Sequence, residues 1–165
     1  MTALSDLSAL VLGPLEGRPG AAWQRAPAGK WTAAQIVEHL AIGLESTAAR
    51  FRERRARAPM ARRPRTASER LARLLIVGLG WFPPGRKAPS GTEPAPHVDG
   101  TAAEARFRAG VAAWEAVARE LLPSRGRDLF VKHPSLGDLT MEEWIRFHVV
   151  HARHHARQIR ERLSA

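Results

Sequence analysis

A repeated helix-start signal constrains the fold of this chain more than any other feature. In a capping box, a Ser or Thr is followed three residues later by Glu or Gln, and each side chain binds the other residue's free backbone N–H. The sequence contains this pattern at Thr32…Gln35, Thr66…Glu69, Thr101…Glu104 and Thr140…Glu143. Each pair precedes a stretch in which apolar residues recur at steps of three and four. We therefore expect a helix to begin at each of these points.

The apolar stripes also indicate how far each helix extends. Helices are expected over residues 3–16, 33–57, 68–79, 102–122 and 141–163. Gly13-Pro14 interrupts the first helix, and Pro123 ends the fourth because proline lacks the N–H that a helix interior uses. No segment alternates with a period of two for long enough to predict a sheet. Lys132 and His133 are expected in an exposed turn before the last helix.

These elements predict an all-α protein with a single helical bundle domain over residues 1–165. A chain of this length can bury a core of its own. The long helices 3–16, 33–57, 102–122 and 141–163 would form an antiparallel up-down four-helix bundle. The short helix 68–79 and the loop 82–99, which is rich in Pro, Gly and Ser, would be an excursion between the second and third long helices.

The composition excludes several kinds of chemistry. The chain has no cysteine, so it has no disulfide, no thiolate metal site and no cysteine nucleophile. No apolar run approaches the roughly 20 residues that a membrane helix requires. The first residues lack the basic leader of a secretory signal. We therefore expect a cytoplasmic protein in which His, Asp or Glu would hold any metal.

The net charge of +10 is concentrated in one segment rather than spread over a face. Residues 50–65 contain eight arginines and one glutamate. Such a segment is more typical of a solvated helix end and linker than of a nucleic-acid interface, which remains the weaker alternative. If the segment lies beside a pocket, its charge favours a small anionic substrate.

The last predicted helix places several histidines on one stripe. This stripe, at the shoulder of a buried apolar face, consists of Trp144, His148, His151, His155, Gln158 and Arg162. His151 and His155 are four residues apart, so their rings stack one above the other along the helix and can hold one ion. The alternative is a pair of hydrogen-bonded or solvated histidines. His154 points away from this stripe and is expected to be exposed.

His39 supplies a third candidate ligand from a different helix. It lies on the inner stripe of helix 33–57, between Ile36 and Gly43. An imidazole buried among apolar side chains needs partners for its nitrogens, and a divalent cation shared with His151 and His155 would provide one. Three imidazoles with open positions for water are typical of a catalytic metal site. Gln158, one turn beyond His155, is a candidate for a hydrogen bond to an ion-bound ligand, or else a surface amide.

The two ends of the chain resemble the DinB/YfiT-like family of metal-dependent four-helix-bundle proteins. The family pattern has Trp and Ser/Thr before a helix that carries a His, here Trp31-Thr32…His39. It closes with a His, a second His four later and a Gln, here His151, His155 and Gln158. The stretch from His133 to Ile159 is also similar to the subgroup with an HP-x-x-G segment, an E-W helix and an H-x-x-H-H end. The resemblance covers nearly the whole chain in helix order and spacing, but its specific motifs lie at the two ends and not within residues 50–100.

The resemblance implies a function as well as a fold. It implies that His39, His151 and His155 bind a divalent metal ion, with zinc and nickel as the leading candidates. It also implies a metal-dependent thiol S-transferase, using a low-molecular-weight thiol, or a hydrolase, acting on a small molecule. The alternatives are a non-enzymatic metal-binding or stress-response protein and, less favoured, a basic nucleic-acid-binding module. Members of the family often dimerise, so a homodimer through helix 68–79 is a further expectation.

Overall fold

The computed structural model describes residues 4–83, 85 and 88–164, and three long helices form the frame of this part of the chain. They are α3 (Ala33–Arg54), α5 (Gly100–Arg125) and α6 (Met141–Ser164). A shorter segment completes the bundle and consists of η1 (Leu4–Asp6), α1 (Leu7–Leu12) and η2 (Gly13–Leu15). One further turn, α2 (Gly20–Trp23), leads toward α3. Residue 3, where the first helix was expected to begin, lies outside the described residues.

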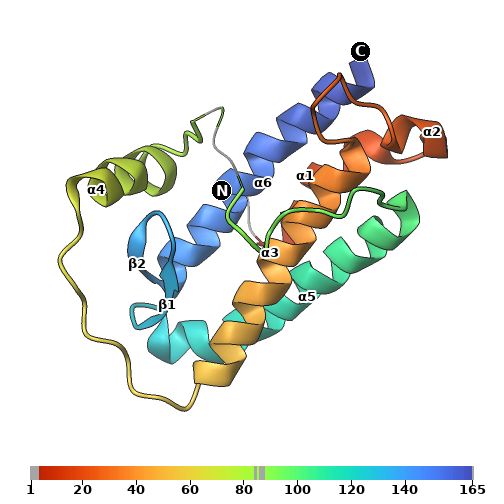
Figure 1. Cartoon of the computed structure of the whole chain (residues 1–165). Coiled ribbons are helices and arrows are strands. Elements are labelled where there is room, and N and C mark those ends of the chain that lie inside the picture. Colours follow the sequence, from red (N-terminus) through yellow and green to blue (C-terminus); the bar gives the residue numbers. More distant parts are fainter. Residues whose placement is uncertain (1–3, 84, 86–87, 165) are drawn as a thin grey trace.

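The core lies between these helices, whose arrangement Figure 1 shows. Large side chains with less than 2% of their surface exposed come from every helix of the bundle, and include Leu7, Ile36, Phe51, Phe107, Trp114, Met141 and Ile159. The prediction of an all-α bundle is confirmed. Among the described residues, none of the helices combines the length and the apolar character needed to cross a membrane.

The directions of the helices differ from a strict up-down alternation. Glu45 of α3 lies 2.8 Å from Arg106 of α5, and further along both helices Arg55 lies 3.7 Å from Glu120. The residue numbers of the contacting partners increase together along the two helices, so α3 and α5 run in the same direction. The connection over residues 55–99 returns the chain to the end of the bundle where α3 begins (Figure 1). By contrast, α6 runs antiparallel to both helices.

Three of the expected capping boxes are present. They begin α3 at Thr32, α4 (Ala67–Arg73) at Thr66 and α6 at Thr140. The box expected at Thr101 is wrong, because α5 begins earlier. Asp99 caps it by accepting a hydrogen bond from Ala102 N at 2.8 Å. Pro123 does not end α5 but lies within its last turn, where only one helix hydrogen bond is lost.

The arginine-rich segment is tied to the bundle rather than solvated throughout. After α3 ends, the chain runs past the strand β1 (Leu129–His133), with Met60 N bonded to Leu129 O at 2.8 Å. Arg63 binds Glu69 at 2.8 Å and lies 3.4 Å from the buried carboxylate of Asp138. The segment then enters α4, which continues into the π-helical turn η3 (Leu74–Gly78). Residues 84, 86 and 87 of the expected loop lie outside the described residues.

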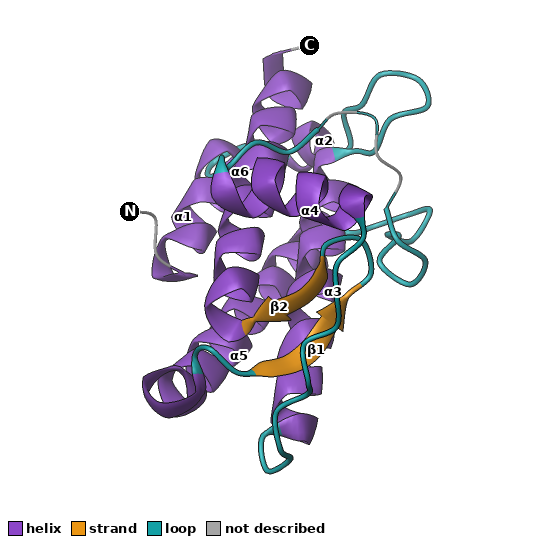
Figure 2. Cartoon of the chain, turned by 90° about the vertical axis from the view of Figure 1, so that its left-hand side faces the viewer, coloured by secondary structure: helices purple, strands orange, loops and turns teal. Residues whose placement is uncertain are grey.

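A two-stranded hairpin before α6 corrects the expectation that no sheet is present. The strands β1 (Leu129–His133) and β2 (Gly137–Thr140) pair antiparallel, and Figure 2 shows the hairpin beside the helices. Strands this short leave no alternation that a sequence pattern can register. His133 is 7% exposed, contrary to the expected exposed turn, while Lys132 is exposed. The His133 ring accepts the N–H groups of Ser135 and Leu136 at 3.1 and 3.2 Å.

Candidate metal centre

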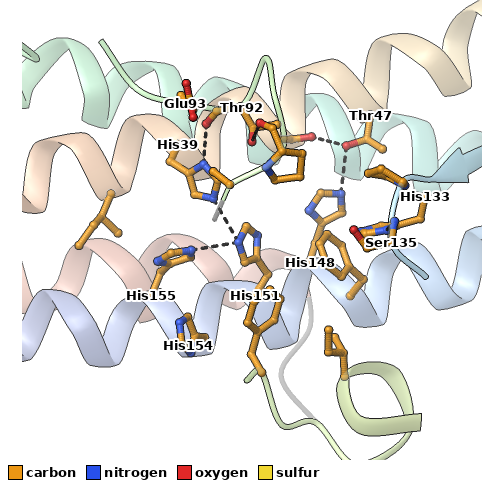
Figure 3. A pocket seen from close by; sticks show the side chains of 18 of the residues that line it. His39, Thr47, Thr92, Glu93, His133, Ser135, His148, His151, His154 and His155 are labelled. Atoms are coloured by element: carbon orange, nitrogen blue, oxygen red, sulfur yellow. Dashed lines mark hydrogen bonds between the residues drawn. The ribbon is translucent and has the colours of Figure 1, made fainter. Parts of the chain in front are cut away.

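Three imidazole rings from two helices converge inside the bundle, as Figure 3 shows. His39 comes from α3, and His151 and His155 come from successive turns of α6. The Nε2 atom of His151 lies 3.2 Å from Nε2 of His39 and 3.0 Å from Nε2 of His155. The candidate ligand atoms of the three rings all lie within 4.8 Å of one another. The structure therefore brings together the three histidines that the sequence pattern indicated.

Hydrogen bonds fix the protonation pattern of two of these rings. Nδ1 of His39 lies 2.6 Å from the backbone oxygen of Thr92, and Nδ1 of His155 lies 2.8 Å from Oε1 of Gln158. Both oxygens can only accept, so each Nδ1 is the protonated nitrogen in the neutral ring. Each Nε2 consequently keeps a lone pair, and both lone pairs are directed toward Nε2 of His151.

This arrangement suits a bound cation. A neutral His151 can donate one Nε2–H at most, so at least one of its two short contacts brings two ring nitrogens together without a hydrogen bond between them, which is repulsive. A cation among the three nitrogens turns that repulsion into attraction. Tetrahedral zinc with Zn–N bonds of about 2.0–2.1 Å separates its ligand atoms by roughly 3.3 Å, close to the contacts in this cluster. The donor set therefore fits one divalent ion.

Burial keeps all three rings neutral and available as ligands. Desolvation lowers the pKa of His39, although its bond to the Thr92 carbonyl opposes the shift. Desolvation followed by the neighbouring histidines lowers the pKa of His151 well below its ordinary value. The same causes lower the pKa of His155 to about 3. Neutral imidazole is the form that binds metals, so protons compete weakly for this site near neutral pH.

The cluster lines a cavity of about 750 Å³, a size that suits a small molecule. Aromatic rings form part of its wall. Trp31 lies with its ring 5.0 Å from that of His39, and Phe82 and Phe147 each stack on His151 at 5.3 Å. These rings fix the orientation of the imidazoles and limit the access of water. Phe82 thus forms part of the cavity wall.

His148 is a wall residue of the same cavity and not a member of the three-histidine cluster. The Thr47 hydroxyl donates to the carbonyl of Gly43 and accepts from Nε2 of His148 at 3.1 Å. Trp114 and Trp144 pack on the ring at 5.1 and 5.7 Å. Complete burial lowers the pKa of His148 to about 3, so it too is neutral. Its stripe position in the sequence indicated burial but not this partner.

The remaining polar candidates have different outcomes. Gln158 contacts His155 through its oxygen and His154 through its nitrogen at 3.1 Å. It therefore orients the ring of the candidate ligand His155 rather than lying free on the surface. His154 is half-buried and lines the cavity, contrary to the expected exposure. Glu38 and Glu45 both bind Arg106, so neither is free to serve the cluster as a base or as a partner for an imidazole.

The charged lining of the cavity also differs from the expectation. Within residues 50–65, all of which the structure describes, Arg50 is the arginine that lines it. The other lining cations are Lys30, Lys132 and Arg162, and the lining carboxylate among the described residues is Glu93. Arg55 lies near Glu120 on the far helix, so it does not serve the pocket. Apart from Arg50, the positive charge at the cavity therefore comes from scattered positions outside the arginine-rich segment.

Comparison with known proteins identifies one family. The family model described as the DinB superfamily matches residues 3–159, nearly the whole chain. The curated proteins and the solved structures contain no match to this sequence. The match covers both helices that carry the three histidines.

Proposed function

This chain belongs to the DinB superfamily, and on that premise we propose that it binds one divalent metal ion through His39, His151 and His155. The observation that carries the proposal is the convergence of Nε2 atoms at 3.0 and 3.2 Å from His151, with the outer nitrogens of His39 and His155 bonded to acceptors. Zinc or nickel suits neutral imidazole ligands.

We propose further that the site acts on a small molecule, as a metal-dependent thiol S-transferase or a hydrolase. A divalent ion with only neutral ligands lowers the pKa of a bound water or thiol and so provides a nucleophile near neutral pH. The chain contributes orientation and exclusion of water. The Thr92 carbonyl and Gln158 hold two imidazoles in the ligand tautomer, and Trp31 and Phe82 cover the cluster. Lining cations favour an anionic substrate.

Reconstitution of the metal-free protein tests this proposal. Chelated protein would be reloaded with zinc or nickel and assayed with a thiol plus an alkylating electrophile, and separately with an activated ester. We expect metal-dependent turnover in one assay, its loss in His39→Ala, and its retention in His97→Ala, which changes an exposed histidine. Turnover that is equal in metal-free and metal-loaded protein would contradict an enzymatic role.

The non-enzymatic alternative makes a different prediction for chelation. If the ion is structural, its removal unfolds the bundle, because binding energy is then folding energy. If it serves catalysis, the helical circular dichroism spectrum survives chelation. We favour the second outcome, because the core of the bundle consists of apolar side chains and contains none of the three histidines. The nucleic-acid alternative is weakened by the internal contacts of Arg63 and Arg65.

Two further proposals concern the setting of the protein. A homodimer would cover exposed apolar side chains on and after α4, namely Leu71, Leu74, Leu79 and Trp81, each at least 50% exposed. Sedimentation velocity with a Leu71→Glu/Leu74→Glu variant tests this dimer.

A cytoplasmic location is proposed from the absence of cysteine.

A further inference from the structure

The cavity extends beyond the three histidines toward the end of α6. Lys30, Trp31, Gln158 and Arg162 line this end, which therefore combines two cations with an aromatic wall. Gln158 and Arg162 lie one and two turns beyond His155, on the same face of the helix. The three-histidine cluster and the cations thus belong to one continuous space.

Arg162 is the less exposed of the two cations at this end. Its side chain is 11% exposed, and its Nε donates to the backbone oxygen of Trp31 at 3.2 Å. Among the described residues, its ion-pair partner is Glu161, with 3.9 Å between Nη1 and the carboxylate, and that carboxylate is 57% exposed. This separation exceeds a hydrogen bond. The guanidinium is therefore largely removed from water while its terminal N–H groups lack a close anionic partner in the described chain.

A cation in such a position favours an anion from outside the chain. Burial of a charge is costly unless a counter-charge and hydrogen bonds compensate for it. A planar guanidinium binds a carboxylate or a phosphate through two parallel hydrogen bonds, an arrangement that Lys cannot reproduce. Lys30 is exposed at the same end of the cavity and adds a second positive charge.

The spacing between the cluster and the cation sets the length of the ligand. Arg162 follows His155 by seven residues, which corresponds to about 10 Å along the helix axis. Trp31 bridges the interval from the opposite wall, since its ring lies 5.0 Å from the ring of His39 while its carbonyl binds Arg162. An extended small molecule can therefore contact both positions, with an apolar middle against the indole.

We propose that Arg162, assisted by Lys30, binds the acidic end of a substrate whose other end reacts at the three-histidine centre. The substrate class is an extended small acid whose carboxylate or phosphate reaches the guanidinium while its other end lies at the metal centre, an interval of two helical turns along α6. This inference rests on the proposed function, because the reacting end requires the metal. It adds a specificity-determining residue, and it assigns the anionic group to the end of α6 rather than to the arginine-rich segment.

Thiol probes on cobalt-loaded protein test the inference without an activity assay. Mercaptohexanoate and mercaptohexanol have the same chain and differ in charge, and the sulfur-to-cobalt absorption band reports binding of either. We expect mercaptohexanoate to bind at least about tenfold more tightly, as a charge-assisted hydrogen-bonded pair implies. In Arg162→Gln this preference should disappear, while mercaptohexanol binds as in wild type. Arg162→Lys should retain part of it.

Arg160→Gln is the matched control, because it removes the same charge from an exposed position two residues away. It should keep the preference. Equal binding of the two probes in wild type, or a preference that survives in Arg162→Gln, would overturn the inference while leaving the metal site intact. If the protein takes up no cobalt, or the band forms with neither thiol, the proposed function fails instead. Where mercaptohexanoate is preferred, a phosphate-ended thiol of similar length shows whether the site binds a carboxylate or a phosphate more tightly.

Discussion

The Nε2 atoms of His39 and His151 lie 3.2 Å apart, although the two residues are 112 positions apart in the sequence. Two helices must be placed accurately to achieve this, because each ring projects from a different side of the cavity. The capping box at Thr32 sets where α3 begins, and the box at Thr140 does the same for α6. Local helix signals thus determine which residues face each other at the site.

Gln158 should govern metal affinity without being a ligand. In Gln158→Leu, Nδ1 of His155 loses its acceptor, so the ring is free to adopt the tautomer that carries its proton at Nε2. We expect zinc affinity to fall by about tenfold to a hundredfold, the usual effect of removing a hydrogen bond behind a ligand. Isothermal titration calorimetry measures it. Gln158→Glu keeps an acceptor oxygen and should remain close to wild type; equal losses in both variants would exclude this role.

Thr47 should contribute to stability rather than to metal binding. Thr47→Val leaves the buried Nε2–H of His148 without its acceptor, which costs about 1–3 kcal/mol of the free energy of unfolding. Urea denaturation measures the change. Ser46→Ala, at the exposed neighbouring position, should stay within about 0.5 kcal/mol. A Thr47→Val variant with wild-type stability but weakened zinc binding would show that Thr47 acts on the metal site instead.

The stability of the metal-free protein should fall with acidification. The pKa of His148 is lowered to about 3 in the folded protein, below the ordinary value of 6.5. The unfolded chain therefore takes up a proton first as the pH falls below about 6.5, so the stability present above that pH is lost toward pH 3. This residue contributes up to about 1.4 kcal/mol per pH unit. His148→Phe should reduce the slope of unfolding free energy against pH; an unchanged slope would contradict the burial of a neutral ring.

The contacts of Asp138 should protect the arginine-rich segment from proteolysis. The carboxylate is 1% exposed, accepts from Arg63 N at 3.0 Å and pairs with the Arg63 side chain. Asp138→Asn weakens this attachment, so trypsin should cleave within residues 55–66 severalfold faster than in wild type. Mass spectrometry of the fragments locates the cuts. Glu104→Gln, which changes the partner of Arg108 on α5, should leave the rate unaltered, and equal protection in both variants would argue against a docked segment.

The helices and the histidine cluster were predictable because both depend on local spacing. Capping boxes and apolar stripes located α3, α4 and α6, and the i,i+4 spacing placed His151 beside His155. Burial on the inner stripe then indicated that His39 faces them. Each of these inferences uses residues within a few helical turns, where the backbone geometry is regular.

The features that escaped prediction depend on contacts distant in the sequence. A backbone carbonyl holds His39, and the carbonyl of Thr92 has no signature in the sequence. The parallel direction of α3 and α5 is set by a long connection rather than by either helix. The hairpin strands are too short to show a period, and their pairing depends on the turn at Gly137, with φ of 76°. Arg162 belonged to the histidine stripe, but its carbonyl partner on Trp31 lies 131 residues away.

Anomalous diffraction from crystals of the zinc-loaded protein locates the metal ion. We expect a single strong peak at the zinc edge, about 2.0–2.1 Å from Nε2 of His39, His151 and His155. The same map from His39→Ala crystals should lose the peak, and that from His97→Ala crystals should keep it. A peak located elsewhere, or no peak among these three nitrogens at saturating zinc, would show that the three histidines do not form the metal site.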